Sequence, residues 1–260
     1  MAQKKKVTAR VVGQRRLAEG IYDLSLETPL AFEAVCGQFV GVYPKDKSTL
    51  LPRPISICET DRERGLLRLV YRVAGKGTAE FSGLKAGDTA ELLGVLGNGF
   101  PTDKAKPGMT ALLFGGGIGV PPILQLAKEL SCEKLIVPGY RDSQCFLMED
   151  FEKYGAVYPA TEDGSVGTKG NVLDAVRQNG LRADIIYACG PMPMLRAVKQ
   201  YALEQDIPAY ISLEERMACG VGACLGCVCR TAKKDPHSHV NNARICTDGP
   251  VFEAREVEIG

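Results

Sequence analysis

The stretch Thr110-Ala-Leu-Leu-Phe-Gly-Gly-Gly-Ile-Gly-Val-Pro-Pro122 decides the fold of the middle of this chain. Its apolar start predicts a buried strand, and its glycines predict a turn that leads into a helix. Backbone amides at such a junction can approach a pyrophosphate, so Gly115, Gly117 and Gly119 are predicted to contact a dinucleotide. The turn departs from the usual G-x-G-x-x-G because Pro122 takes the third place.

Strands and helices alternate on the C-terminal side of this turn. After a helix over Pro121–Leu130, the pattern predicts strands Leu135–Pro138, Ala156–Ala160 and Asp184–Ala188, and helices Met148–Tyr154, Val172–Asn179 and Met192–Glu204. Alternation of this kind is typical of a parallel sheet with helices on both faces. We therefore predict a doubly wound α/β domain that binds a pyridine nucleotide, over residues 104–210.

The Cys189-Gly190-Pro191 motif follows one of these predicted strands. Ligands of open α/β sheets bind at the carboxyl ends of the strands, so Cys189 is a candidate catalytic residue that faces a nicotinamide. The alternative is a packed thiol at a strand end. The sequence leaves NAD and NADP open, because Arg141 could meet a 2′-phosphate and Asp142 beside it would repel one.

Residues 1–103 have a different rhythm, with short strands separated by Gly, Pro and charged residues. The predicted strands are Val7–Val12, Ile21–Glu27, Gln38–Tyr43, Ile55–Cys58, Leu66–Arg72 and Thr89–Leu93. Evenly spaced strands favour an antiparallel sandwich or β-barrel. One short helix is predicted over Thr78–Leu84, with Thr78 as its N-cap.

Three motifs in this β-rich part have the chemistry of a flavin site. In Arg53-Pro54-Ile55-Ser56, the arginine could hold a pyrophosphate and Ser56 could donate a hydrogen bond to the flavin ring. Val70-Tyr71-Arg72 offers an aromatic face and a second cation, and Gly75-Lys76-Gly77-Thr78 precedes the short helix. Each motif alone is weak, since an Arg-Pro pair at a strand start is commonly structural. In this order they predict a site for FAD.

The C-terminal part, residues 211–260, contains Cys219-Gly-Val-Gly-Ala-Cys224-Leu-Gly-Cys227-Val-Cys229 and, further on, Cys246. The spacing C-x4-C-x2-C with a distant fourth cysteine is that of plant-type [2Fe–2S] clusters. We therefore predict that Cys219, Cys224, Cys227 and Cys246 ligate such a cluster, and that Cys229 is a spare thiol. The segment should be organised by its metal centre rather than by an apolar core.

Two other kinds of metal site would use some of the same residues. Cys224 and Cys227 would suit zinc, but His237 and His239 are too close together for a zinc H-x3–5-H pair. A Rieske centre needs two histidines and two cysteines, and leaves the C-x4-C-x2-C run unexplained.

Composition narrows the class of protein. The chain has 260 residues, a formal net charge of +1 and ten cysteines, of which five fall between Cys219 and Cys246. Clustered cysteines favour metal binding in a reducing compartment. The charge balance gives no support for nucleic-acid binding, and no apolar run is long enough to cross a membrane. Without an apolar stretch after the basic N-terminal residues, we expect a cytoplasmic protein.

The motif order R-P-I-S, G-x-G-T, glycine turn and C-G-P resembles the ferredoxin–NADP reductase superfamily. The segments Glu215–Cys224 and Cys246–Phe252 resemble the electron-transfer subunits of NAD-dependent (class 1B) dihydroorotate dehydrogenase. The resemblance implies an FAD-binding barrel, a [2Fe–2S] cluster and NAD⁺ as electron acceptor, in pyrimidine biosynthesis. It also implies a partner, the FMN-containing catalytic subunit, in a two-plus-two heterotetramer. The implied FAD-binding residues are Arg53, Pro54, Ile55, Ser56, Val70, Tyr71, Arg72, Gly77 and Thr78.

Two other functions fit the same motifs. One is an electron-transfer flavin and iron–sulfur subunit of another oxidoreductase, of the hydrogenase, sulfite reductase or transhydrogenase type. The other is a non-catalytic, zinc-stabilised binding module.

Overall fold

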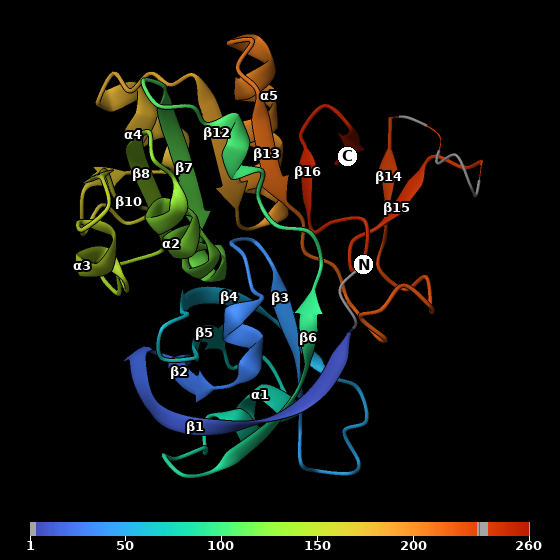
Figure 1. The fold of residues 1–260 in the computed structure, drawn as a ribbon. Helices are drawn as coiled ribbons and strands as arrows, with labels where there is room; N and C mark the ends of the chain where they lie inside the picture. The colour runs from blue at the N-terminus through green and yellow to red at the C-terminus, as the bar shows by residue number, and fades with distance from the viewer. Residues whose placement is uncertain (1–3, 233, 235–238, 260) are drawn as a thin grey trace.

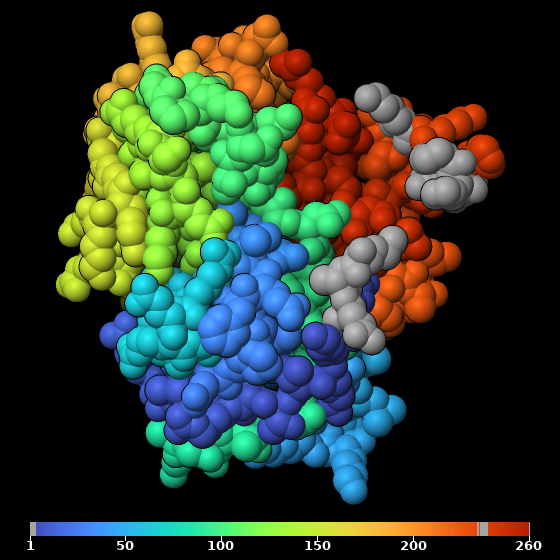
Figure 2. All heavy atoms as spheres, viewed as in Figure 1, coloured from blue at the N-terminus to red at the C-terminus, as the bar shows by residue number. Residues whose placement is uncertain are grey.

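The computed structural model describes residues 4–232, 234 and 239–259. A barrel, an α/β sheet and a small C-terminal sheet follow one another along the chain (Figure 1). The space-filling view shows the three parts in direct contact over one continuous surface (Figure 2). The predicted fold class is confirmed, and the division at residues 1–103, 104–210 and 211–260 stays a prediction. No helix in the described part of the chain is both long and apolar enough to span a bilayer.

The barrel is closed by six antiparallel strands in the order β1-β2-β5-β4-β3-β6. In β5, Leu67, Leu69 and Tyr71 fill the barrel core, whereas Arg68 and Arg72 point outward, as the two-residue period of a strand requires. The strands are β1 (Lys5–Ala18), β2 (Ile21–Glu27), β3 (Phe39–Tyr43), β4 (Arg53–Asp61), β5 (Leu66–Arg72) and β6 (Thr89–Leu96), with a 3₁₀ turn, η1 (Pro29–Phe32), after β2.

The short helix of the barrel, α1 (Lys76–Phe81), begins two residues earlier than predicted. Gly75 is its N-cap, so the prediction of Thr78 as N-cap is wrong. The Thr78 hydroxyl instead works from the third helical position, where its oxygen accepts the N–H groups of Ala74 at 2.8 Å and Gly75 at 3.2 Å. The Thr78 hydroxyl therefore stabilises the start of the helix from within the first turn and not as its N-cap.

The large sheet has the strand order β11-β10-β8-β7-β12-β13-β16, and β9 pairs with β8. All neighbours are parallel except β16, which runs antiparallel to β13. The strands are β7 (Thr110–Gly116), β8 (Glu133–Tyr140), β9 (Ala156–Val157), β10 (Ala160–Thr161), β11 (Thr168–Lys169), β12 (Ile185–Cys189), β13 (Ala209–Ser212) and β16 (Val251–Glu253). The predicted strand Ala156–Ala160 is thus two short strands, and Cys189 ends a strand rather than following one.

Helices cover both faces of this sheet. Leu113 of β7 packs with Ile123 of α2, whereas Phe114, the next residue, packs with α4 and α5 through Val172 and Leu195. Successive strand residues point to opposite faces, so this division confirms the doubly wound arrangement. The helices are α2 (Val120–Glu129), α3 (Met148–Phe151), α4 (Val172–Gln178) and α5 (Met192–Glu204), and the 3₁₀ turns are η2 (Thr102–Lys104) and η3 (Gly117–Gly119).

The C-terminal part forms a three-stranded sheet in the order β15-β14-β17. The strands are β14 (Val228–Thr231), β15 (Asn242–Arg244) and β17 (Val257–Glu258). Ile245, Cys246 and Val257 are fully buried, and they belong to the same apolar core as Phe114 and Leu195. The expectation that this part lacks an apolar core is therefore wrong. Its buried residues pack into the core of the nucleotide sheet.

Candidate functional site

The loop that carries the first three cysteines turns sharply. Gly220 and Gly222 have φ angles of +68° and +83°, a region that glycine enters without steric cost. Three backbone N–H groups, from Val221, Ala223 and Cys224, consequently point at the Cys219 sulfur, at 3.3 to 3.4 Å. This loop therefore offers donors to sulfur, as an anionic iron–sulfur centre requires.

These donors change the acidity of Cys219. Burial alone would raise its pKa, but the N–H groups of Val221, Cys224 and Ala223 outweigh burial and lower the pKa to about 6. Cys246 is the opposite case, because burial and the neighbouring Cys227 thiol raise its pKa to about 11. Cys246 thus needs a bound cation beside it to become a thiolate at neutral pH.

The four cysteines lie close together. Cys219 and Cys224 influence each other's ionisation, as do Cys246 and Cys227, and Cys219 also raises the pKa of Cys246. The backbone joins the second pair as well, since the N–H of Ile245 donates to the Cys227 carbonyl at 2.9 Å. Among the described residues, no group of three or more His, Cys, Asp or Glu side chains is arranged to hold a single metal ion. Four neighbouring thiols can together supply the ligands of an iron–sulfur centre.

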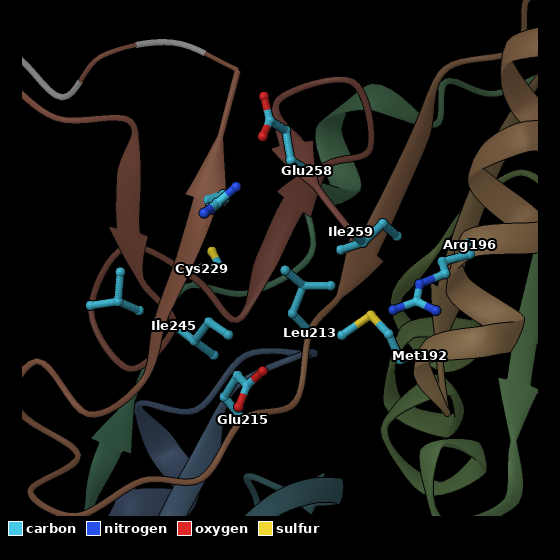
Figure 3. Close-up of a pocket in the computed structure, with 10 residues that line it drawn as sticks. Met192, Arg196, Leu213, Glu215, Cys229, Ile245, Glu258 and Ile259 are labelled. Atoms are coloured by element: carbon cyan, nitrogen blue, oxygen red, sulfur yellow. The ribbon is translucent and has the colours of Figure 1, made fainter.

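Cys229 lies apart from these pairs. Its side chain lines a pocket of about 240 Å³ opposite Met192 and Arg196 of α5 (Figure 3). None of the four predicted ligands lines this pocket. The geometry therefore agrees with a spare thiol at Cys229. Of the two histidines in the zinc alternative, His237 lies outside the described residues.

The R-P-I-S and G-x-G-T motifs come together on the barrel. A Cβ built on Gly77 would lie 2.9 Å from Arg53 Nε, so the arginine side chain rests directly on this glycine. Arg53 is half-buried, and its Nη1 donates to the Leu51 carbonyl at 2.8 Å. Ser56 is half-buried on the same strand. One guanidinium and one turn thus form a shared cradle that fits a phosphate group.

The V-Y-R motif divides between the two faces of β5, with Tyr71 in the barrel core and Val70 and Arg72 on the outward face. The ring of Tyr71 is buried, stacks on Tyr22 with ring centroids 5.9 Å apart, and meets Phe81 edge-on. The aromatic face expected of Tyr71 is therefore not available to a ligand, because the strand alternation turns it into the barrel. Val70 and Arg72 point outward toward the nucleotide part.

The glycine turn and the C-G-P motif meet at the carboxyl ends of β7 and β12. Cys189 is paired in register with Gly115, and a Cβ built on Gly119 would lie 2.4 Å from the Cys189 carbonyl oxygen. On the other side, a Cβ on Gly117 would lie 3.4 Å from Arg72 Nη2. The predicted dinucleotide turn therefore lies between the C-G-P motif and the outward face of β5.

Cys189 is not set up as a nucleophile. Burial raises the pKa of its thiol to about 12, although a hydrogen bond with the Ser212 side chain opposes this. At neutral pH Cys189 is a neutral thiol. It can pack against a ring or donate a weak hydrogen bond, and it does not supply a thiolate.

The cysteine loop rests on the barrel beside the R-P-I-S strand. A Cβ built on Gly220 would lie 3.3 Å from Leu96 of β6. A small cavity of about 10 Å³ between the two parts is lined by Phe39, Gly41, Pro52, Pro54, Leu96, Met217, Ala218 and Gly220. No local sequence pattern signals this contact, because it joins residues more than a hundred positions apart.

Comparisons with known proteins agree with this geometry. Residues 214–258 match the family model described as the iron-sulfur cluster binding domain of dihydroorotate dehydrogenase B, and residues 113–200 match the oxidoreductase NAD-binding domain. The electron transfer subunit of dihydroorotate dehydrogenase B (NAD(+)) from Bacillus caldolyticus is 45% identical over 253 residues, which cover 95% of this chain and 96% of that protein. The corresponding subunit from Listeria welshimeri is 43% identical, with 96% and 98% covered.

Solved structures give the same picture of the fold. The structure of an NADH-dependent reduced ferredoxin-NADP oxidoreductase, described in work on flavin-based electron bifurcation, has a TM-score of 0.84 and 29% identity, with 99% of this chain and 91% of that chain covered. A ferredoxin NADP+ reductase from Neisseria gonorrhoeae with bound FAD and NADP has a TM-score of 0.65 at 15% identity, with 82% and 95% covered, and supports the fold alone.

Fold and site together define a reductase of the ferredoxin–NADP reductase architecture that carries an added iron–sulfur domain. The chain belongs to the family of electron transfer subunits of dihydroorotate dehydrogenase B (NAD(+)). This membership decides against the other oxidoreductase subunits and against a zinc-stabilised binding module. As an electron transfer subunit, the chain serves a catalytic dihydroorotate dehydrogenase subunit.

Proposed function

We propose that this chain takes electrons from the FMN of its catalytic partner through a [2Fe–2S] cluster and FAD, and delivers them to NAD⁺. The observation that carries the proposal is the contact of Gly220 in the cysteine loop with Leu96 of the barrel, beside Pro54. It supports a short route between the cluster ligands and the strand proposed to hold FAD.

The electron count explains why both groups are needed. A hydride carries two electrons to NAD⁺, whereas an iron–sulfur cluster passes one at a time. A flavin can do both, so it belongs between the cluster and the nicotinamide. The order of the three parts agrees with this, because β5 of the barrel faces the nucleotide turn through Arg72 while β6 meets the cysteine loop.

Cys219, Cys224, Cys227 and Cys246 are the proposed ligands. Their C-x4-C-x2-C spacing with a distant fourth cysteine supports a two-iron cluster over zinc. The N–H groups that point at Cys219 would also help to carry the negative charge of the cluster.

The proposed FAD site uses Arg53, Pro54, Ile55 and Ser56 on β4, and the turn at Gly77 and Thr78. Val70 and Arg72 contribute from β5 by their side chains, and Tyr71 by its backbone alone, because its ring is buried. Gly115, Gly117 and Gly119 would receive the nucleotide. Cys189 would line the nicotinamide site as a neutral thiol.

The partner's proposed docking surface surrounds the cysteine loop. Val221 and Leu225 in this loop are exposed apolar residues, as are Leu50 and Leu51, which lead into Pro52 at the same cavity. Exposed apolar groups that gather on one surface commonly mark an interface. Docking of the FMN-containing subunit here, in a two-plus-two heterotetramer, would bring its electrons directly to the cluster.

The test is to purify the complex with its catalytic partner, measure iron and flavins, and add NADH without oxygen. We expect two irons and one FAD for each copy of this chain, and NADH should bleach both flavin and cluster absorbance. Zinc in place of iron, or flavin that NADH does not reduce, would overturn the proposal.

A further inference from the structure

The outward face of β5 is the barrel surface that meets the nucleotide part. Arg68, Val70 and Arg72 share this face, opposite the three core residues of the strand. Val70 belongs to the apolar cluster that contains Ile123 of α2, and Arg72 reaches the turn at Gly117. Arg68, the third member, belongs to none of the motifs that hold a cofactor.

Arg68 binds three carboxylates at once. Its Nε and Nη2 donate to the two oxygens of Asp23, both at 3.0 Å, and its Nη1 donates to Glu59 at 3.2 Å. These two carboxylates belong to the barrel. The same Nη2 also donates to Asp150 of α3, at 3.1 Å, across the boundary to the nucleotide part. Asp23 thus holds the guanidinium flat in a two-pronged pair, and the second N–H of Nη2 reaches the other domain.

The centre of this cluster is enclosed, and its three carboxylates are paired with four cations. The Arg68 side chain is 16% exposed and that of Asp23 is 5% exposed. Each carboxylate also has a second cation: Arg15 pairs with Asp23, Lys128 with Glu59, and Lys153 with Asp150. Partly buried pairs that share partners in this way are screened less by water and salt than isolated surface pairs.

A second set of bonds closes the same boundary. The Gln125 side chain accepts the N–H of Thr60 at 2.8 Å, and Lys128 donates to Glu59 at 2.9 Å. Both residues lie in α2, the helix that begins directly after the glycine turn. The helix is therefore fixed to β4 along its second half, while the turn at its start faces Arg72.

We propose that Arg68 is a positioning residue, which through Asp150 and together with the Lys128–Glu59 pair holds the nucleotide turn at a fixed distance from the flavin strand. This inference rests on the proposed function. Hydride transfer between the nicotinamide ring and the flavin ring depends steeply on their separation. A displacement of about 1 Å can lower the rate about a hundredfold. In this proposal Arg68 acts through Asp150 and not through a contact with either ring.

Three variants test this in the purified complex. Asp150→Asn removes the charge across the boundary and leaves Asp23 on Arg68. Arg68→Lys keeps the charge and loses the two-pronged geometry, and Lys128→Met breaks the second link while keeping most of its stem. Glu27→Gln is the matched control, because Glu27 pairs with Arg10 within the barrel and is exposed.

Rapid mixing with NADH gives the readout. For the three variants we expect the limiting rate of flavin reduction to fall by about tenfold or more, with FAD content and cluster spectrum intact. The half-saturating NADH concentration should change by less than about twofold, because none of these residues is placed at the nucleotide. Glu27→Gln should match the wild type.

Wild-type limiting rates in any two of the three variants would overturn the inference. So would a loss of NADH affinity at an unchanged limiting rate, since that would be an effect on binding. If one variant fails to fold, the other two still decide the question. Failure of the wild-type complex to be reduced by NADH would instead overturn the proposed function.

Discussion

The Arg53 side chain lies on Gly77, so that its Nε is 2.9 Å and its Cγ 3.2 Å from the position that a Cβ of residue 77 would occupy. Strand β4 and the turn at Gly77 can therefore pack closely only because residue 77 has no side chain. The arginine proposed to hold the FAD pyrophosphate is oriented by this contact.

Gly77→Ala should therefore weaken FAD binding. The added methyl has to displace Arg53 or Pro44, and overpacking of this kind costs about 1–3 kcal/mol, or about five- to 150-fold in affinity. Fluorescence titration of FAD onto flavin-depleted protein measures the change. Gly75→Ala is the matched control, because a Cβ at Gly75 has open space and its backbone is extended. Equal affinities for the two variants would contradict the prediction.

Cys246→Ser and Cys229→Ser should differ in their iron content. Cys246 is fully buried beside Cys227, whereas Cys229 lines the separate pocket of Figure 3. We expect Cys246→Ser to lose most of its iron and its visible cluster absorbance, and Cys229→Ser to keep both. A cluster that survives in Cys246→Ser and disappears in Cys229→Ser would show that the fourth ligand is Cys229.

Gly119→Ala should impair the nucleotide site and leave the flavin site intact. A Cβ at residue 119 would lie 2.4 Å from the Cys189 carbonyl oxygen, so the turn must move away from β12. We expect the kcat/KM for NADH to fall by about tenfold, with normal FAD content. Gly13→Ala on β1, where a Cβ meets nothing within 4 Å, is the control. Loss of FAD from Gly119→Ala would mean that the turn supports the barrel rather than the nucleotide.

The effect of replacing Cys189 on flavin reduction should not depend on pH. Because burial raises the pKa of its thiol to about 12, Cys189 stays protonated from about pH 6 to about pH 9. Cys189→Ser should therefore change the rate of flavin reduction by NADH by the same factor across this range. If the thiolate were the active form, the ratio of wild-type to variant rates would rise about tenfold for each pH unit. Reduction rates measured in parallel over the range distinguish the two.

Some of the structure could be predicted because it depends on local periodicity. The helix Met192–Glu204 and the strands Ile21–Glu27 and Leu66–Arg72 have the predicted bounds, since the apolar period and the flanking turn residues agree there. The alternation within Leu66–Arg72 also indicates that Tyr71 shares the core face with Leu69. This period places the Tyr71 ring in the barrel core, contrary to the open aromatic face expected of it.

Other features could not be predicted from local patterns. The start of helix α1 is one of them. The Thr78 hydroxyl could cap the helix either as its N-cap or from within the first turn, and the local sequence is compatible with both. In the structure the helix begins at Lys76 and Thr78 lies in the first turn. The three carboxylates around Arg68 come from β2, β4 and α3. Only the packing of the barrel against the nucleotide sheet brings them to one guanidinium.

The sequence by itself determined the kind of chemistry in each part of this protein. Cysteine spacing, a glycine turn after an apolar strand, and an ordered set of arginine and glycine motifs act over a few residues, where backbone geometry limits what can form. Tertiary structure alone decided that Cys246 lies beside Cys227, that the cysteine loop rests on Leu96, and that the C-terminal sheet shares the nucleotide core. These contacts join residues far apart in the chain, and they form because apolar faces left exposed by each part are buried against another.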